Sequence, residues 1–128
     1  MQRKLTAILS ADVVGYSALM EANEAGTLER LKANRARIFD PHVNIHGGRL
    51  FKLMGDGALV EFPSVIAAVQ CALAIQDATE KASEAGRIRY RIGINLGEVI
   101  VEGDDIYGEG VNVAARIQAL APVGGIAV

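Results

Sequence analysis

The stretch Phe51-Lys52-Leu53-Met54-Gly55-Asp56-Gly57-Ala58-Leu59-Val60 predicts a β-hairpin, around which the rest of the fold can be arranged. An Asp-Gly pair between two apolar runs is the strongest short-range signal for a tight turn between antiparallel strands. Gly55 adds backbone freedom where the chain reverses. We therefore expect strands over residues 49–54 and 58–62, with Asp56 at the tip between them.

The composition is that of one globular domain, which we place over residues 1–128. Hydrophobic residues make up 51% of the chain and charged residues 22%, which is enough for a core at this length. The net charge of −2 argues against nucleic acid or an anionic membrane as the main partner. No apolar run approaches the roughly 20 residues that cross a bilayer. A single cysteine, Cys71, excludes an intrachain disulfide and favours the reducing cytoplasm.

The segment before the hairpin reads as a strand followed by a helix. Residues 4–14 are apolar on both faces, as in a buried strand, and Asp12 interrupts this run. Gly15-Tyr16-Ser17 ends the strand, and a helical pattern follows. Pro41 is expected to end or kink that helix, because proline has no N–H and disfavours helix in the residue before it.

A second helix and an alternating strand follow the hairpin. Ser64 is expected to cap this helix and Gly86 to end it. Residues 87–95 alternate between an apolar face and a row of arginines. Leu96-Gly97 is expected to turn the chain into a short strand over 98–102. The pattern is completed by a helix over 109–120 and a strand over 123–128.

Strand, helix, strand, strand, helix, strand is the element order of a ferredoxin-like α+β fold. Its antiparallel sheet has both helices on one face, and the third strand lies between the first and the second, antiparallel to both. The C-terminal end of the first strand then lies beside the N-terminal end of the third. This layout brings Asp12 and Asp56 to the same end of the sheet.

Two carboxylates in this position indicate a metal site. They repel each other unless a cation lies between them, and carboxylate oxygens suit hard cations such as Mg²⁺ or Mn²⁺. Gly15, Tyr16 and Ser17 offer main-chain N–H groups beside this place, and such groups can cradle a phosphate. The alternative is that Asp12 caps the turn after its strand and Asp56 only serves the hairpin.

Asn112 and Arg116 stand out in a helical segment that is otherwise mostly apolar or small. Because they are four residues apart, they share one face of the helix. Arginine supplies a planar cation that recognises phosphate oxygens. The two residues are either a structural pair or groups directed at a ligand, and the spacing alone leaves both interpretations open.

Taken together, these motifs make the chain resemble the class III nucleotidyl cyclases over nearly its whole length. The matching segments, which follow one another in the family's order, are residues 11–17 (ADVVGYS), 47–49 (GGR), 52–57 (KLMGDG), 91–94 (RIGI) and 105–116 (DIYGEGVNVAAR). A match of several ordered motifs is far more specific than any one of them.

The resemblance implies two divalent metal ions, Mg²⁺ or Mn²⁺, in each active site. Asp12 and Asp56 stand at the positions of the family's two metal-binding aspartates. The main-chain carbonyl of Val13 matches a further metal ligand of the family. On this resemblance, the metal-site interpretation is favoured over the turn-capping one.

The resemblance also implies which groups face the nucleotide. Lys52 and Asp105 match the pair that selects adenine, and the chemistry agrees, because adenine offers an acceptor at N1 and a donor at its 6-amino group. Asn112 and Arg116 match the pair that orients the ribose and stabilises charge on the α-phosphate. The implied reaction is conversion of ATP to 3′,5′-cyclic AMP and pyrophosphate.

In this family the active site lies between two subunits, which implies a homodimer, because this chain carries the residues of both halves. Family catalytic domains continue past the position of Val128, so we expect the domain to be incomplete at its C-terminus. The alternatives are a guanylate or mixed-specificity cyclase, a catalytically silent nucleotide-binding or dimerisation module, and a structural interaction domain.

Overall fold

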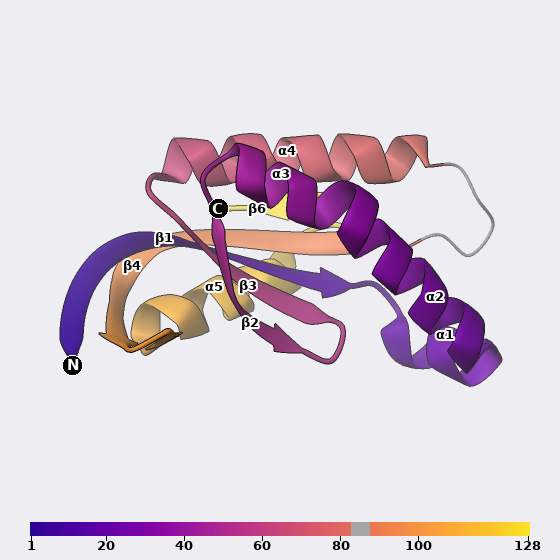
Figure 1. The fold of residues 1–128 in the computed structure, drawn as a ribbon, viewed down its shortest axis with the longest axis horizontal. Helices are drawn as coiled ribbons and strands as arrows, with labels where there is room; N and C mark the ends of the chain where they lie inside the picture. Colours follow the sequence, from indigo (N-terminus) through magenta and orange to yellow (C-terminus); the bar gives the residue numbers. More distant parts are fainter. Residues whose placement is uncertain (83–87) are drawn as a thin grey trace.

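Within residues 1–82 and 88–128, which the computed structural model describes, six strands form one sheet (Figure 1). They are β1 (Gln2–Val13), β2 (Arg49–Met54), β3 (Gly57–Phe62), β4 (Tyr90–Glu102), β5 (Asp105–Tyr107) and β6 (Ile126–Ala127). The order across the sheet is β2-β3-β1-β4-β5, and β6 pairs with β4. The β4–β6 pair is parallel and the other pairs are antiparallel.

The topology is the ferredoxin-like one that the sequence predicts. β3 lies between β1 and β2 and is antiparallel to both, so β1 and β2 run parallel. β4 pairs with the other edge of β1 along its whole length, from Gln2 opposite Val101 to Val13 opposite Tyr90. β1 is therefore the central strand, and its C-terminal end lies beside the start of β3.

Helices cover both faces of this sheet (Figure 1). They are α1 (Tyr16–Ala22), α2 (Glu24–Asn34), the π-helical η1 (Arg35–Phe39), α3 (Asp40–Ile45), α4 (Val65–Lys81) and α5 (Glu109–Leu120). Ser64 caps α4 as predicted, accepting a hydrogen bond of 3.1 Å from the main-chain N–H of Ala67. α4 ends at Lys81, and the predicted end at Gly86 and the first arginine of the predicted row, Arg87, lie outside the described residues.

Pro41 does not end the first helical segment, contrary to one of the two predicted outcomes. α2, η1 and α3 follow one another directly, and Pro41 lies in the first turn of α3. The chain widens into a π-helical turn just before the proline. A proline lacks the N–H that an α-helix uses, and its ring crowds the carbonyl four residues earlier. A change of hydrogen-bonding pattern at this point accommodates both effects.

The hairpin turn is centred one residue earlier than the Asp-Gly signal predicts. Met54 pairs with Gly57, which leaves Gly55 and Asp56 as the two central residues. Gly55 has φ +59°, as the first central residue of a type II′ turn requires, and glycine adopts this conformation without strain. Asp56 therefore occupies the second central position of a tight turn.

The predicted turn at Leu96-Gly97 is wrong, because β4 continues through both residues. Gly97 serves helix packing instead. A Cβ at Gly97 would stand 3.0 Å from the Cα of Gly110, and one at Gly93 would overlap the main chain of Gln118. These glycines let α5 approach the main chain of β4, a role that the sequence cannot distinguish from a turn.

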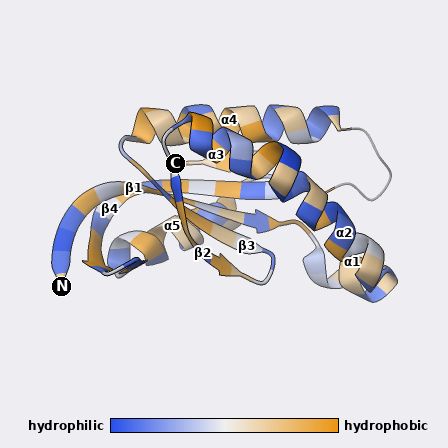
Figure 2. Ribbon diagram, viewed as in Figure 1, coloured by the Kyte–Doolittle hydropathy of each residue, from blue (hydrophilic) through white to orange (hydrophobic). Residues whose placement is uncertain are grey.

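The core has one part on each face of the sheet. On the face of α2, α3 and α4, the largest buried side chains are Leu9, Phe39, Phe62, Ile75, Tyr90, Ile92 and Ile94. On the other face, Val111 and Ala114 of α5 belong to one buried cluster with Ile8, Leu59, Val99 and Ile106 of the sheet. The two early helical segments thus share one face, as predicted. Figure 2 shows β3 as largely apolar and the N-terminal end of β1 as hydrophilic.

Candidate active site

An acid pair, Asp12 and Asp56, forms where β1 ends and the hairpin turns. Asp12 is the penultimate residue of β1, and the pairing of Ala11 with Ala58 sets the end of β1 beside the start of β3. The two carboxyl groups lie close enough for Asp56 to raise the pKa of Asp12. Oδ1 of Asp12 also lies 3.8 Å from the point where a Cβ on Gly57 would stand. The topology therefore brings together the two acids that the sequence singled out.

Asp12 resists ionisation in this position. Burial, together with the hydrogen bond and the charge of Asp56, raises the pKa of its carboxyl group from an ordinary value of 3.8 to about 6. The main-chain N–H of Val13 and the charge of Arg91 lower this pKa by less. Within the described residues, neither carboxylate forms an ion pair. Two negative charges here call for a cation from outside the chain.

The donor set of the acid pair fits a hard divalent ion. Carboxylate oxygens suit Mg²⁺ and Mn²⁺, and Mg²⁺ is commonly held by one or two carboxylates together with substrate phosphates. In the part of the chain that the structure describes, no third Asp, Glu, His or Cys side chain joins the pair. Further ligands would come from the main chain, water or substrate. This is the donor set of a metal that binds together with a phosphate-bearing substrate.

Val13 and the first turn of α1 directly follow Asp12. The side chain of Val13 is buried, so its main-chain atoms are what it can offer to a ligand. Gly15 precedes α1 with φ +65°, a left-handed conformation that favours glycine. The main-chain N–H groups of Tyr16 and Ser17 lie in the first turn of α1, where a helix has no acceptor of its own for them.

The structure also forms the predicted pair of Lys52 and Asp105. Nζ of Lys52 on β2 lies 3.3 Å from Oδ1 of Asp105 at the start of β5. β2 and β5 stand at opposite ends of the strand order, so coiling of the sheet must bring them together. Arg49 adds a second link, because its Nη1 donates to the carbonyl of Asp104 at 3.5 Å. Both side chains of the pair are partly exposed and open to a ligand.

Asn112 and Arg116 lie one turn apart on the side of α5 that faces away from the sheet. α5 buries Gly110 and Ala114 against β4, whereas Asn112 and Arg116 are exposed. Arg116 forms an ion pair of 3.1 Å with Glu109. No hydrogen bond among the described residues joins Arg116 to Asn112. Asn112 and Arg116 therefore do not form a structural pair with each other in the described part of the chain.

Two contacts of these residues were not predicted from the sequence. Glu109 lies seven residues before Arg116, a spacing that places both on one helix face and could have been noticed. The contact of Arg49 with the carbonyl of Asp104 depends on the coiling of the sheet, which no local sequence pattern reveals.

The predicted site residues thus form two contacting pairs and one outward-facing helix side. No hydrogen bond or ion pair within residues 1–82 and 88–128 connects either pair with Asn112 or Arg116. The acid pair can hold divalent cations, and the Lys52–Asp105 pair offers one donor and one acceptor. The helix side adds a cation and an amide, so the predicted site residues stand in three separate parts of the chain.

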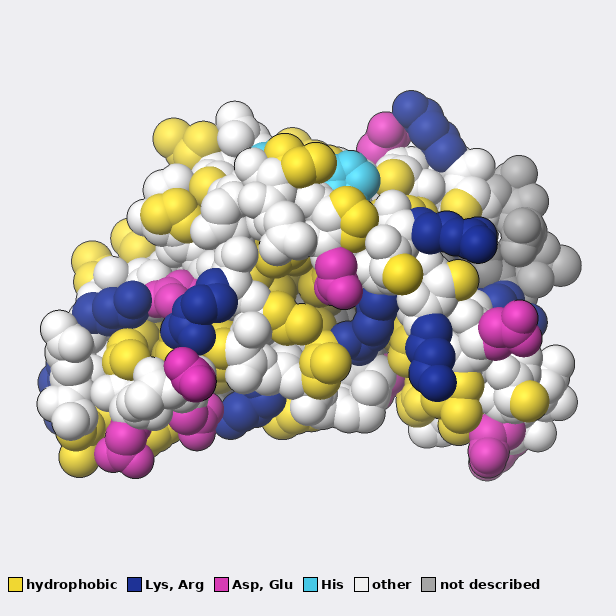
Figure 3. All heavy atoms as spheres, viewed as in Figure 1, with side chains coloured by type: hydrophobic (Ala, Val, Ile, Leu, Met, Phe, Trp, Pro, Cys, Tyr) yellow, Lys and Arg dark blue, Asp and Glu magenta, His cyan; other side chains and the backbone are white. Residues whose placement is uncertain are grey.

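The surface shows no dominance of one charge in the view of Figure 3, where basic and acidic side chains are interspersed. This agrees with the net charge of −2. Among the helices of the described residues, none has both the length and the apolar character needed to cross a membrane.

Residues 2–128 match the family model for the adenylate and guanylate cyclase catalytic domain. The putative adenylate cyclase 3 of Rhizobium meliloti is 51% identical over 132 residues, which cover 100% of this chain and 22% of that protein. More generally, this chain spans between 15% and 30% of the length of the curated relatives that it matches.

Solved structures agree with this match. An adenylate/guanylate cyclase/hydrolase from Silicibacter pomeroyi superposes with a TM-score of 0.88 at 46% identity, over 98% of this chain and 75% of that one. The guanylyl cyclase Cya2 gives a TM-score of 0.83 at 26% identity, over 98% of this chain and 74% of that one. With the fold, the acid pair and these matches in agreement, the chain belongs to the class III adenylate and guanylate cyclases and corresponds to their catalytic domain.

Proposed function

We propose that this domain is an adenylate cyclase, which converts ATP to 3′,5′-cyclic AMP and pyrophosphate. The observation that carries the proposal is the acid pair at the end of β1, which lacks an ion-pair partner among the described residues. The preformed Lys52–Asp105 pair supports ATP as the substrate. The name of the Rhizobium meliloti relative, a putative adenylate cyclase, points the same way.

Asp12 and Asp56 would hold two divalent ions, with the main-chain carbonyl of Val13 as a further ligand. When bound, such ions lower the pKa of the attacking ribose 3′-hydroxyl and neutralise the triphosphate. The N–H groups of Tyr16 and Ser17 would bind phosphate oxygens, since the N-terminal end of a helix attracts anions. The chain's own part in this half of the site is to bind and orient the triphosphate.

Lys52 and Asp105 would read the base. In this assignment, Nζ of Lys52 donates to N1 of adenine, and the carboxylate of Asp105 accepts from the 6-amino group. Guanine presents a donor at N1 and an acceptor at C6, so each protein group would face a like group. The 3.3 Å contact between the two side chains would open when the base takes its place between them.

Arg116 would stabilise the negative charge that grows on the α-phosphate, and Asn112 would orient the ribose. Both face away from their own sheet. They would therefore act on a nucleotide held at the acid pair of a second copy, which gives a homodimer with two equivalent sites. Most of the rate enhancement then comes from positioning and electrostatic stabilisation.

The test is cyclic AMP formation from ATP and Mn²⁺ by the wild type and by Asp56→Asn, which keeps the size of the turn residue. Asp77→Asn, an exposed carboxylate on α4, serves as the control. We expect activity in the wild type and in Asp77→Asn and its loss in Asp56→Asn. Equal activity in Asp56→Asn and the wild type would contradict the proposal.

The same assay separates the alternative functions. A guanylate or mixed-specificity cyclase would turn over GTP as fast as ATP. The likeness to the guanylyl cyclase Cya2 supports this alternative. A silent module would bind an ATP analogue with Mn²⁺ and release no pyrophosphate. The cytoplasmic location remains a prediction from the sequence.

A further inference from the structure

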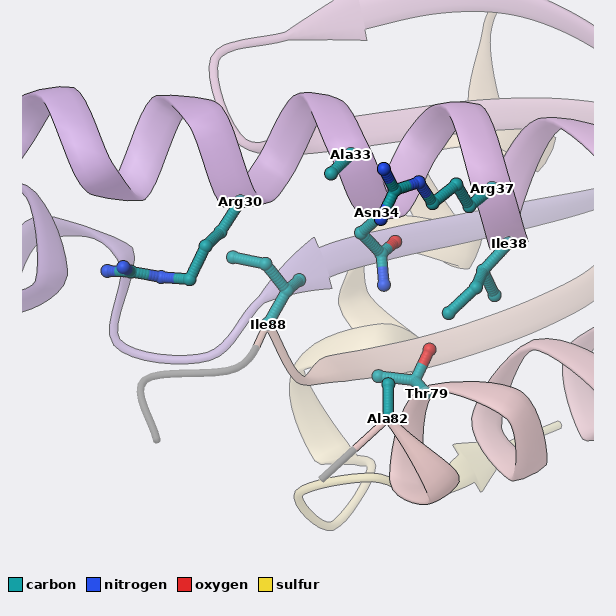
Figure 4. A pocket seen from close by; sticks show the side chains of 8 residues that line it. All are labelled: Arg30, Ala33, Asn34, Arg37, Ile38, Thr79, Ala82 and Ile88. Atoms are coloured by element: carbon teal, nitrogen blue, oxygen red, sulfur yellow. The ribbon is translucent and has the colours of Figure 1, made fainter. Parts of the chain in front are cut away.

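A cavity of about 140 Å³ lies between the α2–η1 segment and the C-terminal end of α4 (Figure 4). The polar groups that line it are Arg30, Asn34, Arg37 and Thr79, and the largest apolar ones are Ile38 and Ile88. It lies on the face of the sheet opposite α5, so it is separate from the helix side that carries Asn112 and Arg116. Its volume is close to that of a cavity of about 150 Å³ that binds benzene in another protein.

Two residues that line this cavity, Arg30 and Thr79, each carry a buried hydrogen-bonding atom with no partner in the described part of the chain. Thr79 is only 3% exposed, and its Oγ1 makes no hydrogen bond within the described residues. Nε of Arg30 is likewise buried and unpaired. The third such atom in the described part of the chain is Oε2 of Glu61, and it lies 2.6 Å from Nζ of Lys4 in an ion pair. Unpaired buried polar atoms are rare and call for an explanation such as a bound ligand.

The free polar groups on the cavity are mainly donors. The Asn34 side-chain carbonyl already accepts the hydroxyl proton of Tyr90 at 2.6 Å, which leaves the Asn34 amide N–H groups for a ligand. None of the described residues that line it is acidic. Within the described residues, neither Arg30 nor Arg37 forms an ion pair. The cavity therefore suits an anion that accepts hydrogen bonds.

The donors are spread along the cavity and not gathered at one point. Arg30 and Arg37 are seven residues apart, which corresponds to about 10 Å along a helix. Figure 4 shows Asn34 and Thr79 turned toward one another, with Arg30 on the other side of Ile88. A single carboxylate cannot reach both ends, whereas a molecule with an acceptor group at each end and a short apolar chain between them can.

We propose that this cavity binds a short dicarboxylate of four to six carbons. One carboxylate accepts from Arg30, the other from Thr79, Asn34 and Arg37, and the methylene groups between them contact Ile38 and Ile88. The inference is independent of the cyclase reaction, because none of these residues belongs to the proposed active site. π-Helical turns are frequent at functional sites, and η1 contributes two of the lining residues, Arg37 and Ile38.

The proposal is tested by calorimetric titration of the whole chain with glutarate, with butyrate and inorganic phosphate as comparison ligands. We expect saturable one-to-one binding of glutarate that is about tenfold or more tighter than that of either comparison ligand, as expected when a second charged contact is added. No saturable binding of glutarate up to about 20 mM, a concentration that detects very weak complexes, would overturn the proposal. Tighter binding of butyrate or phosphate would overturn it as well.

Variants locate the binding at this cavity. Arg30→Met and Arg37→Met should each weaken glutarate binding about tenfold, and Thr79→Val several-fold, since each removes a hydrogen bond to a charged group. Lys32→Met, an exposed residue of α2 that does not line the cavity, is the matched control and should bind as the wild type does. Thr79→Val keeps the shape of the side chain and removes an unpaired hydroxyl, so its melting temperature should not fall. Unchanged affinity in the Arg30 and Thr79 variants would place the binding elsewhere and overturn the proposal.

Discussion

The acid pair and the Lys52–Asp105 pair differ in how their charges are balanced. Asp12 and Asp56 are two like charges at the end of β1, and burial together with Asp56 raises the pKa of Asp12 to about 6. Lys52 and Asp105 are opposite charges 3.3 Å apart, and both remain partly exposed. Arg116 and Glu109, 3.1 Å apart, form another exposed pair of opposite charge, as Lys52 and Asp105 do.

This contrast separates two ways of preparing a site. Exposed pairs of opposite charge contribute little to stability and are easily opened, so the groups that we propose to bind the base and the α-phosphate can stay paired until substrate binds. The acid pair has no such partner among the described residues and opposes folding while both groups are ionised. We infer that the acid pair is the part that requires a ligand, and the other pairs are the parts that exchange partners.

Among the residues of the exposed ion pairs, the largest effect is expected for Arg116→Ala. If Arg116 exchanges Glu109 for the α-phosphate, its loss should lower the turnover of ATP on the order of 10²-fold or more. Initial rates of pyrophosphate release would measure this. Arg3→Ala is the control, because Arg3 forms a similar exposed ion pair of 3.0 Å with Glu98. A loss of activity of the same size in both variants would show that Arg116 has no specific role in the reaction.

A smaller effect is expected on the choice of base. Lys52→Glu combined with Asp105→Ser exchanges donor and acceptor, so the ratio of kcat/KM for ATP to that for GTP should fall about tenfold or more. Lys32→Glu makes the same lysine-to-glutamate replacement on α2 and should leave the ratio unchanged. If the double variant keeps the wild-type ratio while still folding, base selection lies with other residues.

The smallest effect concerns the stability of the metal-free protein. The folded state raises the pKa of Asp12, so ionisation of Asp12 opposes folding, and stability from this group falls as pH rises from about 4 to about 6. Asp12→Asn should therefore stabilise the metal-free protein at pH 7.5 by about 1 kcal/mol, less than the full pKa change implies because part of the group is in water. Urea unfolding with a chelator would measure it.

Two controls sharpen this stability measurement. The gain from Asp12→Asn should vanish below about pH 4, where the wild-type carboxyl is protonated in both states. Asp77→Asn removes an exposed acid that pairs with Lys81 at 3.0 Å and should give no gain at pH 7.5. A destabilising effect of Asp12→Asn in metal-free buffer would show that the acid pair is not under electrostatic strain.

The meeting of Asp12 and Asp56 was predictable because it follows from topology alone. Element order gave the strand layout, and the hairpin at residues 55–56 fixed which ends meet. That Asn112 and Arg116 share one face of α5 was also predictable, because residues four apart in a helix lie on the same face.

Other features were not predictable, because one residue type serves several purposes. Gly97 reads as a turn, yet it lets α5 approach β4. Pro41 suggests the end of a helix, yet a π-helical turn just before it lets the helical segment continue. The Lys52–Asp105 contact and the Arg49 link depend on how far the sheet coils, which is set by the packing of the whole core and not by local sequence.

The most direct test of the account combines both kinds of pair in one mixing experiment. Asp56→Ala and Arg116→Ala proteins, each expected to keep at most about a hundredth of the wild-type activity alone, are mixed in equal amounts and allowed to exchange subunits. Random pairing makes half of the dimers mixed, and each mixed dimer has one intact site of two, so about a quarter of the wild-type activity should return. If differently tagged subunits prove that mixed dimers have formed and no activity returns, the acid pair and Arg116 do not act on one nucleotide from two chains, and the account is contradicted.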